Sequence, residues 1–218
     1  QHPQKGILPP IQFLPIIENH VIEIAVGEWV IDTALTQIEH WQKAGLDIKV
    51  SVNISANQLQ EANFVKRLHE IFSVHPDLNP LSLEIELLET SELEDITRTA
   101  KIIEACKDIG VSFALDDFGT GYSSLTYLKQ LPITLIKIDQ SFVRDMLIDS
   151  NDLNILEGVI GLAKAFHRQV IAEGVETVEH GTLLLELGCD LAQGYAIARP
   201  MTAHEIQNWI SSWQTFPE

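Results

Sequence analysis

Seven oxygen-bearing side chains stand at or just beyond the ends of six apolar runs, in a pattern that could bind divalent metal ions. The runs are short and rich in β-branched residues, so each is expected to be a buried strand. The side chains are Asn53, Glu86, Asp116, Asp117, Asp139, Glu173 and Gln193. One polar residue at a strand end is ordinary, but one at every strand end is typical of the catalytic mouth of a parallel barrel.

Five of these side chains are carboxylates, which cannot all be ionised in one buried place without cations. Removing an unpaired charge from water costs several kcal/mol, and Lys137 is the one lysine at these strand ends. A set of oxygen ligands without Cys or His favours Mg²⁺ or Mn²⁺ over Zn²⁺. The adjacent Asp116 and Asp117 suit a pair of ions, which would activate water for in-line displacement at phosphorus. Lys137 could orient that water or neutralise phosphoryl oxygens.

The apolar runs alternate with helical patterns, which predicts a parallel sheet covered by helices. Strands are expected at residues 48–52, 81–85, 111–115, 133–138, 169–172 and 189–192. Helices are expected at residues 25–44, 63–72, 96–109, 123–130, 153–166, 178–187 and 203–213. Thr177 and Thr202 are expected N-caps. Neither common glycine-rich phosphate loop follows the first run, so the polar strand ends favour a barrel over an open doubly wound sheet.

Length and composition predict one soluble, cytoplasmic domain over residues 1–218. The chain has 31 Asp and Glu against 14 Lys and Arg, for a net charge of −17. A nucleic-acid polymer is therefore not an expected partner, and an anionic substrate would need cations beside it. No apolar run reaches the ~18 residues of a membrane span, and the two cysteines are expected to be reduced thiols. The start, without methionine or signal sequence, is typical of the middle of a longer chain.

The longest motif is a loop with two glycines at residues 117–124, which Glu89 is placed to hold by hydrogen bonds. Together the motifs resemble the EAL family of cyclic di-GMP phosphodiesterases, in order and spacing, from about residue 8 to about residue 209. The matching strings are Asn53-Ile54-Ser55-Ala56, Glu86-Leu87-Leu88-Glu89, Asp116-Asp117-Phe118-Gly119-Thr120-Gly121-Tyr122-Ser123-Ser124, Lys137-Ile138-Asp139, Ala172-Glu173-Gly174-Val175-Glu176 and Gln193-Gly194-Tyr195.

The resemblance implies a modified TIM (β/α)8 barrel that hydrolyses cyclic di-GMP to linear pGpG with two Mg²⁺ or Mn²⁺ ions. The implied metal ligands are Asn53, Glu86, Asp116, Asp117 and Glu173, and the implied catalytic residues are Lys137 and Glu173. The implied supporting or substrate-binding residues are Asp139, Glu176, Gln193 and Gly194. Glu89 is the implied anchor of the 117–124 loop, which in the family also touches a dimer interface. Expected partners are cyclic di-GMP, a second copy of the chain, and fused GGDEF or sensory domains in a parent protein that could be membrane-anchored.

The chain departs from the family pattern at its start. The Glu-Ala-Leu segment, whose Glu is a metal ligand in the family, is absent from residues 1–218. The first two barrel strands are also absent, which leaves six of the expected eight. Two alternatives therefore stand beside the hydrolase: a non-catalytic cyclic di-GMP receptor, and a module that mainly dimerises through the 117–124 loop. The residue at the upstream Glu-Ala-Leu position would discriminate the receptor from the hydrolase.

Overall fold

The computed structural model describes residues 2–6, 8–18, 20–89, 93, 95–121 and 124–213, without the side chain of Ser124. Its sheet has six strands in the order β1-β2-β3-β4-β5-β6, so neighbours in sequence are neighbours in space. All five pairings are parallel. The strands are β1 (Val50–Asn53), β2 (Leu83–Leu88), β3 (Ser112–Phe118), β4 (Leu135–Ile138), β5 (Gln169–Glu173) and β6 (Leu191–Gln193).

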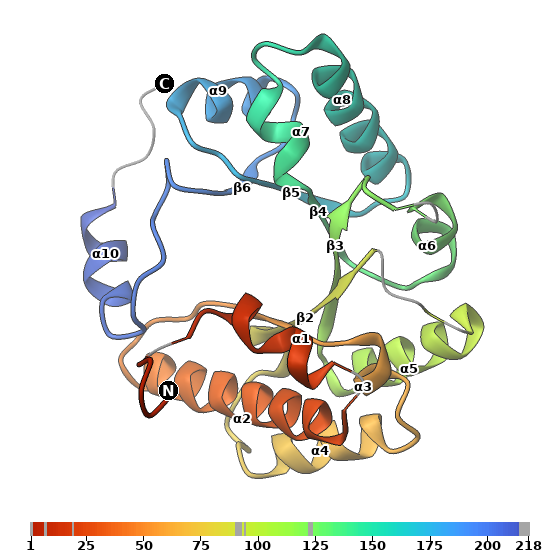
Figure 1. Cartoon of the computed structure of the whole chain (residues 1–218), viewed down its shortest axis with the longest axis vertical. Helices are drawn as coiled ribbons and strands as arrows, with labels where there is room; N and C mark the ends of the chain where they lie inside the picture. The colour runs from red at the N-terminus through yellow and green to blue at the C-terminus, as the bar shows by residue number, and fades with distance from the viewer. Residues whose placement is uncertain are drawn as a thin grey trace.

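Helices fill the connections between these strands, as parallel pairing requires. The longer helices are α2 (Val21–Lys43), α4 (Phe64–Ser73), α5 (Ile96–Ile109), α6 (Ser124–Gln130), α8 (Ser150–Ala165), α9 (Val178–Glu186) and α10 (Ile206–Ser212). The short ones are η1 (Pro10–Gln12), α1 (Leu14–Ile17), α3 (Ala56–Leu59), η2 (Pro80–Ser82) and α7 (Gln140–Asp145). Figure 1 shows the strands as a curved wall, with α2, α4, α5, α6 and α8 on its outer side. This curled α/β architecture confirms the expected fold class. Within the described ranges, every helix is too short or too polar to cross a membrane.

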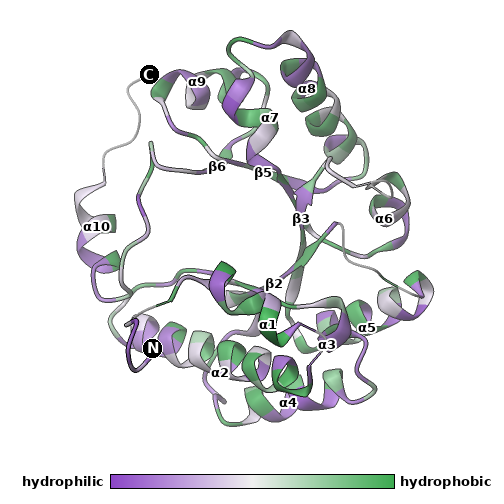
Figure 2. Ribbon diagram, viewed as in Figure 1, coloured by the Kyte–Doolittle hydropathy of each residue, from purple (hydrophilic) through white to green (hydrophobic). Residues whose placement is uncertain are grey.

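The two faces of the curled sheet differ sharply in polarity. On the helix-facing side, Ile85, Phe113 and Ile136 are completely buried and belong to the hydrophobic core. Helices such as α2, α4 and α8 accordingly alternate between hydrophobic and hydrophilic segments along their length (Figure 2). The β2 sequence reads Leu-Glu-Ile-Glu-Leu-Leu, and successive side chains of a strand face opposite sides. The glutamates Glu84 and Glu86 therefore face the interior of the curve, where the candidate site lies.

The predicted strands are all present, but most predictions ended too early. The strand expected at 81–85 is Leu83–Leu88, and the one expected at 111–115 is Ser112–Phe118. Backbone pairing continues through Glu86 and Asp116 and resumes at Phe118, because a ladder needs only N–H and C=O groups, whatever the side chain. The chemically interesting residues are thus held within or directly beside paired strands, which fixes them more firmly than a loop would.

Helix predictions succeeded where the apolar period was long. The helix expected at 96–109 has those bounds, whereas α2 begins at Val21 instead of residue 25. Thr177 caps α9 by accepting a hydrogen bond from the His180 N–H. The expected N-cap at Thr202 is wrong: α10 begins at Ile206, and the Thr202 N–H instead donates to a carboxylate oxygen of Glu205 at 2.8 Å. The short α1, α3 and α7 were not predicted, because one turn of helix carries no measurable period.

Candidate active site

A buried lysine lies at the centre of the candidate site. Lys137 Nζ contacts Glu86 Oε2 at 2.9 Å, Asp116 Oδ1 at 2.9 Å and Glu173 Oε1 at 2.7 Å. These carboxylates come from β2, β3 and β5, so one ammonium from β4 joins four strands on the interior face. Burial opposes the charge, but the three carboxylates outweigh burial and raise the pKa of Lys137 above its ordinary value. In the metal-free protein the lysine is therefore positively charged near neutral pH.

An irregularity in β3 explains how two consecutive aspartates reach one site. In a regular strand Asp116 and Asp117 would face opposite sides of the sheet. The pairing of β3 with β4 shifts register between Leu115 and Phe118, and Asp117 has a φ of 54°. Such a bulge re-aims side chains, and aspartate tolerates positive φ better than most residues. One oxygen each from Asp116, Asp117 and Glu173 consequently lie within 4.8 Å of one another.

The carboxylates of this group carry more negative charge than Lys137 can compensate. Burial raises the pKa of Asp117 to about 6, with further contributions from the charges of Asp116, Asp139 and Glu173 and from a hydrogen bond with Asp139. Burial also raises the pKa of Glu173, although Lys137 partly opposes this shift. Both shifts mean that the protein by itself stabilises these charges poorly, as expected where a further cation belongs.

The donor atoms also fit a divalent cation. Asp116 Oδ1 is buried and accepts no hydrogen bond from the described residues. Its 2.9 Å contact with Lys137 Nζ is thus an ion pair without hydrogen-bond geometry, which leaves lone pairs free. Carboxylate oxygens that converge in this way are the ligands that Mg²⁺ and Mn²⁺ prefer. The acidic group of Asp116, Asp117 and Glu173 could therefore hold a metal ion.

The remaining predicted ligand, Asn53, lies at the end of β1. It pairs in register with Glu86, so its side chain shares the interior face with Glu86. The side chain of Asn53 is exposed. The fold thus brings four predicted ligands, Glu86, Asp116, Asp117 and Glu173, into one cluster with Lys137 and sets Asn53 at its edge.

The predicted supporting residues surround the same end of the sheet. Asp139 accepts a hydrogen bond from the Ser141 N–H at 2.9 Å and so caps α7. Gln193 pairs in register with Glu173, while Glu176 is exposed beyond β5. At Gly194, an added Cβ would lie 2.2 Å from the backbone oxygen of Val175. Glycine therefore allows the ends of β5 and β6 to approach each other.

The start of the 117–124 loop is held by Glu89. This buried carboxylate accepts hydrogen bonds from the N–H groups of Gly119 at 2.7 Å and Gly121 at 3.1 Å. A side chain at Gly121 would collide with it, since a Cβ there would lie 2.8 Å from Glu89 Oε1. Tyr122 and Ser123 of this loop lie outside the described residues.

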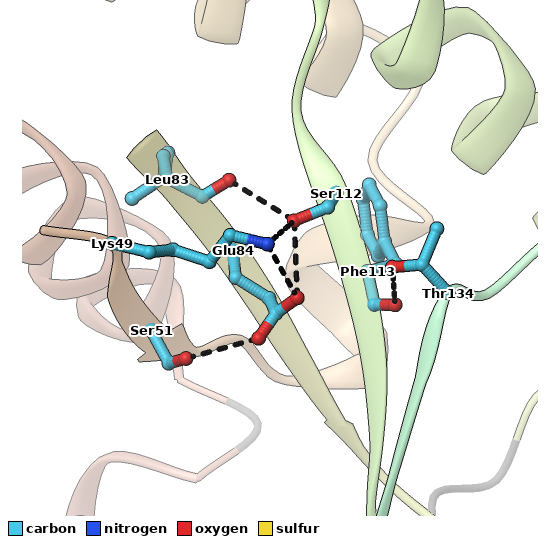
Figure 3. Close-up of polar contacts among 7 residues, drawn as sticks. All are labelled: Lys49, Ser51, Leu83, Glu84, Ser112, Phe113 and Thr134. Carbon is cyan, nitrogen blue, oxygen red and sulfur yellow. Dashed lines mark hydrogen bonds and ion pairs between the residues drawn. The ribbon is translucent and has the colours of Figure 1, made fainter. Parts of the chain in front are cut away.

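A second polar cluster on the interior face was missed by the sequence reasoning. Glu84 is buried and contacts Lys49, Ser51 and Ser112 (Figure 3). The signal was present in the alternation of apolar and acidic residues along β2. The apolar run was expected to be a buried strand, so the acidic residue within it was not taken as a candidate site residue.

The model of the EAL domain family matches residues 1–200. The chain is 34% identical over 210 residues to the cyclic di-GMP phosphodiesterase PA2567 of Pseudomonas aeruginosa, covering 96% of the chain and 36% of that relative. It is 38% identical over 207 residues to the bifunctional diguanylate cyclase/cyclic di-GMP phosphodiesterase MucR of the same organism, covering 94% of the chain and 30% of that relative. The chain thus spans about a third of the length of these relatives.

A solved structure agrees with the fold. The complex of the PaMucR phosphodiesterase with c-di-GMP superposes with a TM-score of 0.87 at 38% identity. The match covers 94% of this chain and 83% of that one.

Proposed function

Because the chain belongs to the EAL domain family, we propose that it is the metal-dependent phosphodiesterase domain of a larger protein and hydrolyses cyclic di-GMP to linear pGpG. The observation that carries the proposal is the convergence of Asp116, Asp117 and Glu173, whose donor oxygens lie within 4.8 Å of one another beside the charged Lys137. The names of the two relatives above support the substrate, since both include the words cyclic di-GMP phosphodiesterase.

In this proposal the interior face supplies the ligands of two Mg²⁺ or Mn²⁺ ions. The residues that would hold them are Asn53, Glu86, Asp116, Asp117 and Glu173, together with the glutamate of an upstream Glu-Ala-Leu segment. When bound, such ions lower the pKa of water and neutralise charge at a phosphodiester. They would also offset the repulsion that raises the pKa of Asp117.

The protein side chains would orient the substrate and set the charge of the site. Lys137, held by three carboxylates, places a permanent positive charge where a phosphoryl oxygen would develop negative charge. Its side chain is only 7% exposed, so it would act at short range in a place with little competing water. Asp139, Glu176, Gln193 and Gly194 lie at the rim of the same end of the sheet, where they could contact the nucleotide.

The proposal also covers the binding partners and the cellular location of the chain. From the family resemblance we propose a homodimer through the 117–124 loop and fused GGDEF or sensory domains. From the composition and the two cysteines we propose a cytoplasmic location. The fused domains also agree with the lengths of the relatives, of which the chain covers about a third. Light scattering with and without Mg²⁺ and nucleotide would test the dimer.

The decisive experiment is a turnover assay with cyclic di-GMP and Mg²⁺ or Mn²⁺, in which chromatography separates pGpG from substrate. The assay should be run on this chain and on a longer protein that also includes an upstream Glu-Ala-Leu segment. Asp116→Asn should lower turnover of the active form by about 10²-fold or more, because it removes a ligand oxygen and a charge from the site. Asp108→Asn is the matched control, since Asp108 is exposed on α5, outside the site.

Near-normal turnover of Asp116→Asn would refute the metal-site assignment. If both the chain and the longer protein bind cyclic di-GMP without hydrolysing it, the chain is a receptor and the hydrolase proposal is wrong. Calorimetry with the same nucleotide separates that outcome from a failure to bind.

A further inference from the structure

A buried carboxylate lies on the same interior face as the candidate metal site, two residues earlier along β2 than Glu86. Glu84 is 3% exposed, and its Oε2 lies 3.3 Å from Lys49 Nζ and 3.1 Å from Ser112 Oγ. Its Oε1 accepts a hydrogen bond from Ser51 Oγ at 3.3 Å. Lys49 Nζ also donates to Ser112 Oγ at 3.2 Å, which closes the group into a network (Figure 3). We call these four residues the Glu84 group.

The Glu84 group joins three strands. Glu84 pairs in register with Ser51 of β1 and with Ser112 of β3, and all three side chains therefore share one face. Two residues further along β1 and β2 are Asn53 and Glu86, which also pair in register. Two residues span about 6.6 Å of strand, so the Glu84 group lies directly beneath these two proposed ligands.

The group has particular weight for β1. In the described sheet the backbone of β1, four residues long, pairs with β2. On the interior face the side chains of Ser51 and Lys49 add contacts to this pairing, and both end on the Glu84 carboxylate. A carboxylate this deeply buried would be unfavourable without them.

We propose that Glu84 is a positioning residue for the metal site: through Ser51 and Lys49 it holds the end of β1 so that Asn53 stands level with Glu86. This inference rests on the proposed function, because Asn53 and Glu86 matter as ligands only if the site binds metal. Within the described residues, the hydrogen bonds and ion pair of the Glu84 side chain go to Lys49, Ser51 and Ser112 and not to a proposed ligand atom. Its effect is on the geometry with which Asn53 completes the ligand set, as expected of residues that support metal ligands.

The test uses Mn²⁺ alone as the probe, titrated into the chain and followed by electron paramagnetic resonance. Glu84→Gln should weaken Mn²⁺ binding by about tenfold, the lower end of what outer-shell residues contribute. Ser51→Ala removes a contact to β1 without any change of charge and should weaken binding in the same direction. Glu157→Gln, an exposed site on α8, loses the same charge as Glu84→Gln and should stay within about twofold of wild type.

A second readout needs no metal. The side-chain amide of Asn53 has its own NMR signals, and both Glu84→Gln and Ser51→Ala should shift them in metal-free protein, while Glu157→Gln should not. Urea unfolding checks that each variant is folded before it is titrated.

These outcomes separate the inference from the proposed function. If wild type neither binds Mn²⁺ nor hydrolyses cyclic di-GMP, the proposed function fails, and the Asn53 signals still decide whether Glu84 holds β1. If wild type binds Mn²⁺ and both variants match it, with unchanged Asn53 signals, the inference is overturned. Weakening by Glu84→Gln without any effect of Ser51→Ala also overturns it, because charge alone would then explain the change.

Discussion

Replacing Lys137 by methionine should destabilise the metal-free protein by about 3–5 kcal/mol, the range observed when one partner of a buried ion pair is removed. Methionine has a similar length and no branch, so it fills the space of the lysine stem without overpacking. What it removes is the positive charge that, among the described residues, contacts Glu86, Asp116 and Glu173 at 2.7–2.9 Å. Three carboxylates would then share a largely buried site.

The size of the effect is limited by proton uptake. Carboxylates that lose their cation can bind protons instead. Each unit by which the pKa of such a carboxyl group rises corresponds to about 1.4 kcal/mol in favour of its protonated form. A carboxyl group whose pKa is raised in the folded state stabilises the fold below its ordinary pKa, and that contribution is lost as pH rises through the raised value. The deficit of Lys137→Met should therefore be larger near pH 7 than near pH 5.

Divalent ions should distinguish this explanation from simple loss of packing. A ligand that binds only the folded state stabilises it by about 2.7 kcal/mol at a hundred times its dissociation constant. Without the competing charge of Lys137, the carboxylates attract a cation more strongly. Mn²⁺ should therefore stabilise Lys137→Met more than it stabilises wild type.

The assay is urea unfolding followed by circular dichroism, with a chelator and then with excess Mn²⁺. Lys43→Met is the control, since Lys43 pairs with Glu39 on the exposed surface of α2 and such pairs contribute little. A Lys137→Met variant within about 1 kcal/mol of wild type in the chelator would refute the reasoning, because a buried charge cluster cannot lose its cation so cheaply. An equal Mn²⁺ effect on both proteins would refute it as well.

Two further predictions concern Asp117 and Gly27. Burial and neighbouring carboxylates raise the pKa of Asp117 to about 6. The free energy of unfolding of the metal-free protein should therefore fall as pH rises from about 4 to about 6. Asp117→Asn should remove that part of the pH profile in urea titrations. Identical profiles for the two proteins would contradict the shift. Gly27→Ala should destabilise the fold by about 1–2 kcal/mol. A Cβ at this position would lie 1.7 Å from Oε1 of the buried Gln58, and the cost of this overpacking exceeds the gain in helix propensity. Gly158→Ala on α8, with no atom within 4 Å of the added Cβ, should instead stabilise by about 0.5–1 kcal/mol in the same thermal or urea unfolding experiment.

Much of the fold is written in local patterns. The helix at 96–109 was predicted with its observed bounds, because a long 3.6-residue period and a glycine at its end are local signals. The strand positions were also readable, although their ends were not. Polar residues such as Glu86 and Asp116 look like the end of a strand in a sequence, whereas in the sheet the backbone ladder passes through them.

The types and order of the candidate site residues were likewise available from the sequence. Acidic residues at successive strand ends, with Lys137 among them, indicated a place that needs cations, and the motif order pointed to one family. What could not be read was the pairing within the cluster. That Lys137 contacts three carboxylates from three different strands depends on the curvature of the sheet, to which residues up to 87 positions apart along the chain contribute.

By itself the sequence determined which residues are apolar, which are charged and how they alternate. This pattern decides which segments form helices and strands and which strand residues make the interior face polar, since burial and hydrogen bonding act on each residue type in the same way everywhere. Tertiary structure alone decided three features: the bulge that turns Asp116 and Asp117 toward one point, the caging of Lys137, and the Glu84 group beneath them. Each depends on where neighbouring strands place their side chains in space. Register depends on how the hydrophobic patterns of neighbouring strands are matched, and curvature depends on packing over the whole sheet, so neither can be read from one segment alone.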